Sequence, residues 1–173
     1  MAKGIKPVRS TPQDIETIIG SFEKYAWTDI QHAKSRPIAS FILSICFIEQ
    51  LSTFIYEFDA NNKSKAEWFF SQYMEQYKGI DLYNKARHSL VHNYSSRYEF
   101  DIDNRGLFED VPYKIIDGVI NINTNVFIGY LEIAFEKAKK TLRDSKNLEG
   151  KYTPYNNALK NSLYYPVLVD TAG

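Results

Sequence analysis

Apolar residues recur at three- and four-residue steps through most of this 173-residue chain, and this helical period restricts the fold more than any other feature of the sequence. Thr11 can cap a first helix, Pro12 suits its first turn, and Pro37 interrupts it. This pattern predicts an amphipathic helix of about 20 or more residues. Its buried face is expected to consist of Ile15, Ile18, Ile19, Phe22, Ala26, Ile30 and Ala33.

A second predicted helix runs from Ile38 to about Tyr56 and is apolar on nearly every side, as is typical of a helix with neighbours all round. Its most hydrophobic part ends at Ile48 and is followed by Glu49 and Gln50. That part falls short of the roughly 20 apolar residues that cross a bilayer. We therefore expect a central core helix and no membrane contact.

The third predicted helix begins at a capping box, in which Ser64 and Glu67 satisfy each other's backbone donors. It ends before Gly79, after which Asp81 can cap a fourth helix. The aromatic residues of the third helix could stack on bases, but their helical spacing favours packing in the core and between subunits of a dimer. They are Trp68, Phe69, Phe70 and Tyr73.

The apolar period changes to two between about residues 98 and 122, where Asp117 and Gly118 form a turn signal between β-branched residues. Helical period returns at Asn125 and continues to Leu142. The last helix gathers positive charges near its end, where the helix dipole favours them and where they could also line an RNA path. These residues are Lys137, Lys139, Lys140 and Arg143.

Together these elements predict a mainly α fold, an up-and-down bundle of four to five helices. A small β-hairpin at about 98–122 is inserted before the last long helix, and a tail follows from about 146 to 173. The length suits one domain spanning residues 1–173, because such a chain buries roughly two thirds of its unfolded surface.

The charge balance limits the classes of partner that the chain can bind, because the sequence has 21 basic and 21 acidic side chains. A net charge of zero argues against a strongly basic nucleic-acid coat protein or a polybasic membrane binder. The N-terminus shows no secretory signal, and the single cysteine, Cys46, cannot form an internal disulfide. These features predict a cytoplasmic protein.

The fourth predicted helix carries Arg87, His88 and His92 within six residues. An arginine offers a cationic fork for phosphate, and a histidine can exchange a proton near neutral pH. This pair of groups suits phosphodiester chemistry. In RNA cleavage the 2'-hydroxyl attacks its adjacent phosphate, so a proton acceptor and a cation suffice without a metal.

This motif resembles that of the HEPN family (higher eukaryotes and prokaryotes nucleotide-binding domain): an arginine, a polar residue, three further residues and a histidine. Arg87, His88 and His92 occupy those positions. The helical layout over about residues 11–145 is similar as well, with a strongly apolar second helix and the motif late on the fourth.

The resemblance implies a metal-independent endoribonuclease without a cofactor, found in toxin-antitoxin and other defence systems. It implies a homodimer whose two motifs face one another across a cleft that receives RNA. His92, Asn93 and Tyr94 match a longer form of the motif. In the subgroup with that form, a nucleotidyltransferase antitoxin silences the toxin by adenylylating the tyrosine.

Several alternatives stay open. Five residues at 100° each place Arg87 and His92 about 140° apart on an ideal helix, which favours a site formed between two subunits or a frayed helix end. His88 and His92 share a face and could bind zinc, but no third ligand at helical spacing completes that site. Tyr94 could also be a packing residue, and the chain could be a non-catalytic helical module that binds nucleotide, RNA or protein.

Glu49 is a further candidate, because a charge at the end of an apolar helix is costly unless it is paired. We expect its carboxylate either to orient the Arg87 guanidinium or to reach solvent at the edge of the bundle.

Overall fold

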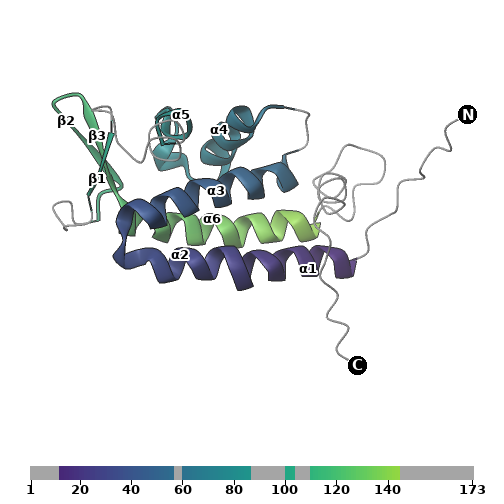
Figure 1. Cartoon of the computed structure of the whole chain (residues 1–173). Coiled ribbons are helices and arrows are strands. Elements are labelled where there is room, and N and C mark those ends of the chain that lie inside the picture. Colours follow the sequence, from purple (N-terminus) through teal and green to yellow (C-terminus); the bar gives the residue numbers. More distant parts are fainter. Residues whose placement is uncertain (1–11, 57–59, 87–99, 104–109, 145–173) are drawn as a thin grey trace, which may run out of the picture.

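The computed structural model describes residues 12–56, 60–86, 100–103 and 110–144 (Figure 1). Long helices lie side by side, and a small sheet lies at one end of them. The chain is mainly α, as the apolar period predicts.

The first predicted helix is confirmed as an almost unbroken helical rod, but part of it is a π-helix. Its segments are α1 (Pro12–Ser21), the π-helical η1 (Phe22–Trp27), α2 (Thr28–His32) and the 3-10 turn η2 (Ala33–Ser35).

Aromatic packing explains the π-helical segment. Residues five apart lie about 140° apart on an α-helix, whereas a π turn is closed by bonds between such residues and brings them to one side. In this π turn Phe22 and Trp27 contact the same two rings. The ring centroid of Phe47 lies 5.4 Å from that of Phe22 and 5.9 Å from that of Trp27. The ring centroid of Phe135 lies 6.3 Å from that of Phe22 and 6.0 Å from that of Trp27. The side chain of Thr28 supports the widened turn by donating to the carbonyl of Glu23 (3.0 Å).

Helix α3 (Pro37–Ile55) is the predicted core helix, with Pro37 in its first turn. Ten of its residues are buried, among them Phe41, Ile48 and Leu51, which are completely inaccessible. Among the described helices, α3 alone is long and apolar enough to span a membrane, with a mean hydropathy of 1.8 over a window that is 56% buried. The expectation that this helix falls short of a bilayer span is therefore wrong by length and composition, although the core helix of a soluble protein passes the same test.

The next helices are α4 (Asn62–Tyr73), the 3-10 turn η3 (Glu75–Tyr77) and α5 (Leu82–Ala86). The predicted capping box at Ser64 is wrong. Asn61 caps α4 instead, because its side-chain oxygen accepts from the backbone N–H of Ser64 (2.9 Å) one turn before the predicted start. The cap predicted at Asp81 is confirmed, since its carboxylate accepts from the backbone N–H of Asn84 (3.4 Å).

The aromatic residues of α4 pack in the core, as their spacing favours. Phe69 and Phe70 are buried, and Trp68 contacts the rings of Tyr56 and Tyr73 edge-on at 5.1 and 5.7 Å. Stacking on RNA bases is therefore excluded for the two phenylalanines.

The predicted hairpin is confirmed between β2 (Tyr113–Ile116) and β3 (Val119–Asn123), which pair antiparallel. Asp117 and Gly118 connect them with φ angles of 51° and 78°, the left-handed conformation of a two-residue hairpin turn. The sheet also has a strand that the hairpin prediction did not separate, β1 (Phe100–Asp103), which pairs parallel to β3 in the order β1-β3-β2.

Helix α6 (Thr124–Asp144) follows β3 directly and packs against both α3 and the first helical rod, which also contact each other (Figure 1). Asn123 caps it by accepting from the backbone N–H of Val126 (3.2 Å). Its buried stripe repeats at three- and four-residue steps, as predicted, and consists of Phe127, Ile128, Leu131, Ala134, Phe135, Ala138 and Leu142.

Candidate functional site

Five residues of the predicted site lie outside the described part of the chain: Arg87, His88, His92, Asn93 and Tyr94. The angle between Arg87 and His92, the two-histidine zinc alternative and the role of Tyr94 therefore stay predictions.

Helix α5 is the described element that leads into the motif. Leu82 and Tyr83 anchor it in the core with exposed fractions of 1% and 4%. At its start the Asp81 carboxylate accepts from both the backbone and the side chain of Asn84, the latter at 3.0 Å. The helix packs against α3 and α4. The described part of α5, up to Ala86, is thus fixed by two buried side chains and a cap.

Glu49 lies half-buried on α3, and the structure gives it a partner that the sequence analysis missed. The side-chain amide of Asn62, at the start of α4, donates to Oε1 of Glu49. The predicted pairing with Arg87 falls outside the described residues. The contact shows that Glu49 joins α3 to α4 instead of simply reaching solvent. The signal in the sequence was the pair of asparagines, Asn61 and Asn62, at the start of α4.

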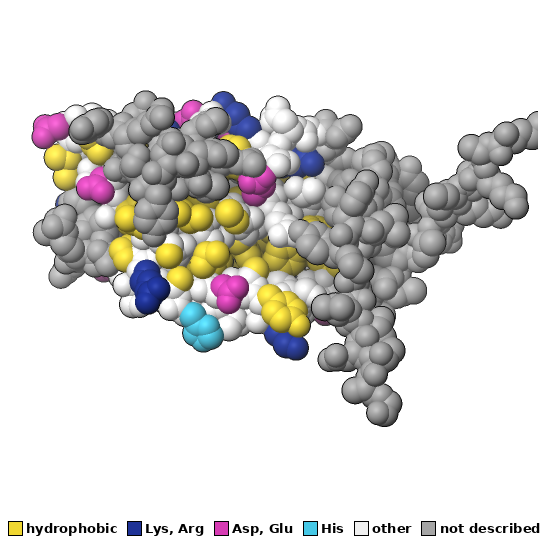
Figure 2. All heavy atoms as spheres, viewed as in Figure 1, with side chains coloured by type: hydrophobic (Ala, Val, Ile, Leu, Met, Phe, Trp, Pro, Cys, Tyr) yellow, Lys and Arg dark blue, Asp and Glu magenta, His cyan; other side chains and the backbone are white. Residues whose placement is uncertain are grey.

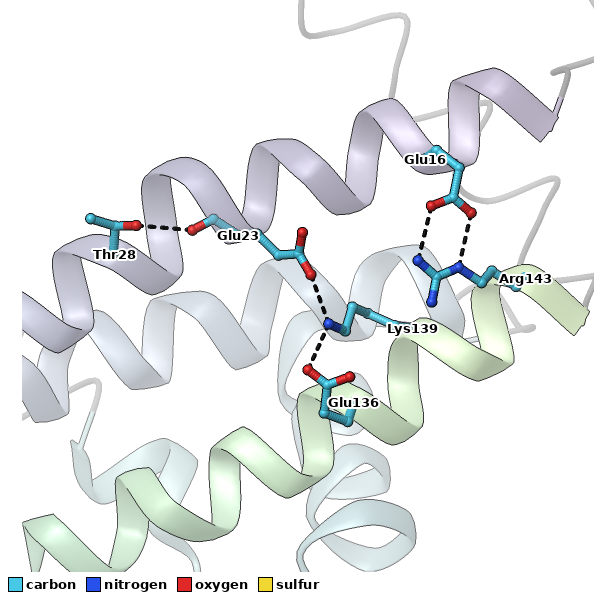
Figure 3. Close-up of polar contacts among 6 residues, drawn as sticks. All are labelled: Glu16, Glu23, Thr28, Glu136, Lys139 and Arg143. Carbon is cyan, nitrogen blue, oxygen red and sulfur yellow. Dashed lines mark hydrogen bonds and ion pairs between the residues drawn. The ribbon is translucent and has the colours of Figure 1, made fainter.

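Two of the cations near the end of α6 bind carboxylates of the first helical rod (Figure 3). Nζ of Lys139 lies 2.7 Å from Oε1 of Glu23 and 2.6 Å from Oε1 of Glu136, and the residue is only 8% exposed. Burial alone lowers the pKa of Lys139, but the hydrogen bonds with Glu136 and Glu23 outweigh burial and raise that pKa above its ordinary value. This lysine is a structural ion-pair partner and not a phosphate ligand.

Arg143 makes a bidentate ion pair with Glu16, in which Nε and Nη2 each lie 2.9 Å from a carboxylate oxygen. The hydrogen bond with Glu16 raises the pKa of Arg143 further. Both side chains are about half exposed. The expectation that Lys139 lines an RNA path is therefore wrong, because its ammonium group is buried in ion pairs. Arg143 stays about half exposed, and its ion pair with Glu16 holds α6 against the first rod.

Tyr77 is another polar group that the sequence analysis did not single out. It is completely buried, its hydroxyl has no hydrogen-bond partner within the described part of the chain, and burial raises its pKa. The rings of Phe127 and Tyr113 lie 5.0 and 6.2 Å from its own. Because aromatic side chains enclose it, Tyr77 belongs to the core.

Metal binding finds no support among the described residues. Within 12–56, 60–86, 100–103 and 110–144, no three His, Cys, Asp or Glu side chains are grouped so that they could hold a metal ion. His32, on α2, is exposed.

No family model, curated protein or solved structure matches this chain. The resemblance to the HEPN family therefore depends on the motif and the helical layout alone.

Proposed function

We propose that this chain is a metal-independent endoribonuclease of HEPN type that acts as a homodimer in the cytoplasm, as a toxin or defence component. The observation that carries the proposal is the spacing of Arg87, His88 and His92 in the sequence, where Arg87 follows Ala86, the last described residue of α5. The capped and buried stem of α5 supports it, because a catalytic group needs a rigid base.

The proposed reaction breaks a P–O5' bond of RNA. His92 removes the proton of a 2'-hydroxyl, whose oxygen attacks the adjacent phosphorus, and the leaving 5'-oxygen is protonated by the histidine of the other subunit or by water. Arg87 stabilises the negative charge on the phosphate oxygens, and His88 positions the phosphate. The products are a 2',3'-cyclic phosphate and a 5'-hydroxyl end, with no change in oxidation state.

The test is incubation of the purified chain with single-stranded RNA in the presence of EDTA. The proposal predicts cleavage, and His92→Ala is expected to lower its rate by about 10² to 10⁴. His32→Ala, which removes an exposed histidine outside the motif, is the matched control and is expected to retain full activity. A requirement for added metal, or equal rates for His92→Ala and the native chain, would contradict the proposal.

Because Tyr94 completes the longer form of the motif, we also propose that a nucleotidyltransferase antitoxin adenylylates its hydroxyl. Co-expression with a nucleotidyltransferase from a neighbouring gene is expected to add one AMP group to the chain, detectable by mass spectrometry. Tyr94→Phe removes the accepting hydroxyl and should abolish that mass increase. An undiminished increase in Tyr94→Phe would place the modification elsewhere.

A second candidate is a non-catalytic HEPN-like module that binds a nucleotide, RNA or a protein partner. The ion pairs of Lys139 and Arg143 favour its protein-binding form, since these two cations bind carboxylates instead of lining an RNA path on α6. Stable binding of a protein partner without RNA cleavage in EDTA or in Mg²⁺ would favour this candidate over the nuclease.

A further inference from the structure

Strand β2 is an outer strand of the sheet, and within the described part of the chain it pairs with β3 alone. The backbone N–H of Asn123 donates to the carbonyl of Pro112 (3.1 Å), which fixes the phase of the hydrogen bonds between the two strands. Bonded and non-bonded pairs alternate in an antiparallel ladder, so Tyr113 and Ile115 form non-bonded pairs with β3. Their N–H and C=O groups therefore point to the open edge of β2.

The side chains of β2 are more exposed than those of β3 beside it. Ile115, at 65%, is the most exposed large hydrophobic side chain among the described residues, and Ile116 is 45% exposed. Ile120, which lies opposite Ile115 on β3, is only 8% exposed. Successive side chains point to opposite faces, so β2 leaves an isoleucine uncovered on each face of the sheet. Figure 2 shows hydrophobic side chains on the surface at the end of the molecule where Figure 1 places the sheet.

An open edge with exposed apolar side chains is a site for the addition of another strand. The opposite outer strand, β1, carries Asp101 and Asp103 among its four residues, and charges on an edge discourage such pairing. The one charge of β2, on Lys114, lies on the face of Ile116, so β2 has no charge on the face of Ile115. The edge of β2 is therefore the one that needs a cover.

We propose that residues 164–169 of the same chain add to the open edge of β2 as a fourth strand. This inference goes beyond the proposed nuclease and does not depend on it. The segment has aromatic and β-branched residues, which favour strands, and no charged residue. Because it is apolar at successive positions, it matches an edge that exposes an isoleucine on each face. Its residues are Tyr164, Tyr165, Pro166, Val167, Leu168 and Val169.

Pro166 determines which backbone groups of the segment face β2. Proline has no N–H, so an edge strand accepts it only where its nitrogen points away from the ladder. Because backbone groups alternate along a strand, the N–H groups of Tyr165, Val167 and Val169 then point to β2 in either strand direction. These groups supply partners for the outward N–H and C=O groups of β2.

The C-terminal part of the chain is long enough to reach the sheet. The ion pair of Arg143 with Glu16 places the end of α6 beside α1, and the sheet lies at the other end of α6, which follows β3 directly. A helix of 21 residues spans about 31 Å, whereas residues 145–163 span up to about 60 Å when extended. Residues 1–11 start from the same end and span at most about 40 Å, which leaves too few of them to pair with β2.

Pairing within one chain also needs little affinity. A tethered segment meets its site at an effective concentration of about a millimolar, so even weak strand pairing is populated. The added strand would keep β2 from pairing with strands of other chains.

Amide hydrogen exchange of the full chain, followed by NMR without RNA, tests this pairing. The amides of Tyr113 and Ile115 are expected to exchange at least about tenfold more slowly in the native chain than in Val167→Pro, which removes a donor that faces β2. Leu168→Pro is the matched control, because the N–H of Leu168 points away from β2. This variant should retain the slow exchange of the native chain.

The amides of Lys114 and Ile116 bond to β3, so they report on the hairpin itself and should exchange at the same rate in all three proteins. Equal exchange of Ile115 in the native chain and in Val167→Pro would overturn the proposal. Loss of the slow exchange in both proline variants would overturn it as well. Slow exchange that appears only when the chain concentration rises from about 1 to 100 μM would assign the edge to a second copy and refute pairing within one chain.

Discussion

Replacement of Lys139 by methionine tests whether the buried ion pairs hold α6 against the first helical rod. The ammonium group lies between the carboxylates of Glu23 and Glu136, at 2.7 and 2.6 Å. Its nitrogen also lies 5.0 Å from the ring centre of Phe135. Lys139→Met removes the charge and keeps most of the apolar stem over that ring, so the variant isolates the ion pairs from the packing.

The expected cost follows from the exposure of each group. A hydrogen bond to a charged group contributes about 1.5–3 kcal/mol when buried, but Glu23 and Glu136 are 47% and 64% exposed, which reduces each bond to about 1 kcal/mol. The two carboxylate oxygens lie within about 5 Å of each other, and without the lysine their repulsion adds roughly 1 kcal/mol at the surface. Burial of a methionine instead of an ammonium group returns about 1 kcal/mol. We therefore expect Lys139→Met to lower the free energy of unfolding by about 2 kcal/mol.

Urea unfolding followed by far-ultraviolet circular dichroism measures this loss, and a thermal scan should show a Tm lower by roughly 4–8 °C. Arg143→Met is the matched control on the same helix. Its ion pair with Glu16 is 45% exposed on both sides, so its loss should cost about 0.5 kcal/mol. If Lys139→Met costs no more than Arg143→Met, burial does not strengthen the Lys139 ion pairs and the reasoning is refuted.

Two further predictions concern pH and the backbone. The folded-state pKa of Lys139 is raised, so its ion pairs stabilise the fold fully below the ordinary lysine pKa of 10.5. This contribution is lost as the pH rises through the folded-state pKa. The difference in unfolding free energy between the native chain and Lys139→Met should therefore stay constant between about pH 7 and 9 and shrink above about pH 10.5. Gly118→Ala should destabilise the chain by about 1 kcal/mol because φ is +78° there. Gly129→Ala, in α6, should stabilise it by up to about 1 kcal/mol, because no atom outside the local helix backbone lies within 4 Å of the added Cβ. Urea unfolding that shows the same sign for both would contradict these backbone assignments.

The long elements of the fold could be predicted from the sequence because their signals are local. Pro37 separates the first rod from α3, and Asp117 with Gly118 makes the hairpin turn, because both depend on backbone preferences of single residues. The buried stripe of α6 follows the helical period from Phe127 to Leu142. These features needed no knowledge of what packs against them.

The features that the sequence analysis missed depend on contacts between distant segments. The π-helical turn exists because Phe22 and Trp27 meet the same two rings, one on α3 and one on α6. The parallel strand β1 is set by pairing with β3, about 20 residues further along the chain. The start of α4 was misplaced for a different reason: asparagine and serine cap helices about equally well, and the capping-box pattern selected Ser64 although Asn61 stands one turn earlier.

The charged end of α6 shows why a run of cations does not by itself indicate a nucleic-acid surface. The sequence places Lys137, Lys139, Lys140 and Arg143 within seven residues, but the helix turns Lys139 and Arg143 toward carboxylates of the first rod and leaves Lys137 and Lys140 exposed. Binding of RNA through this helix would have to compete with those ion pairs, and the net charge of zero offers no compensating attraction. If the chain cleaves RNA, we therefore expect the phosphate to be held mainly by Arg87 of the motif, so that Arg87→Ala should weaken RNA binding far more than Lys140→Ala in a filter-binding assay. Equal losses of RNA affinity in Arg87→Ala and Lys140→Ala would show that α6 contributes to RNA binding as much as the motif does.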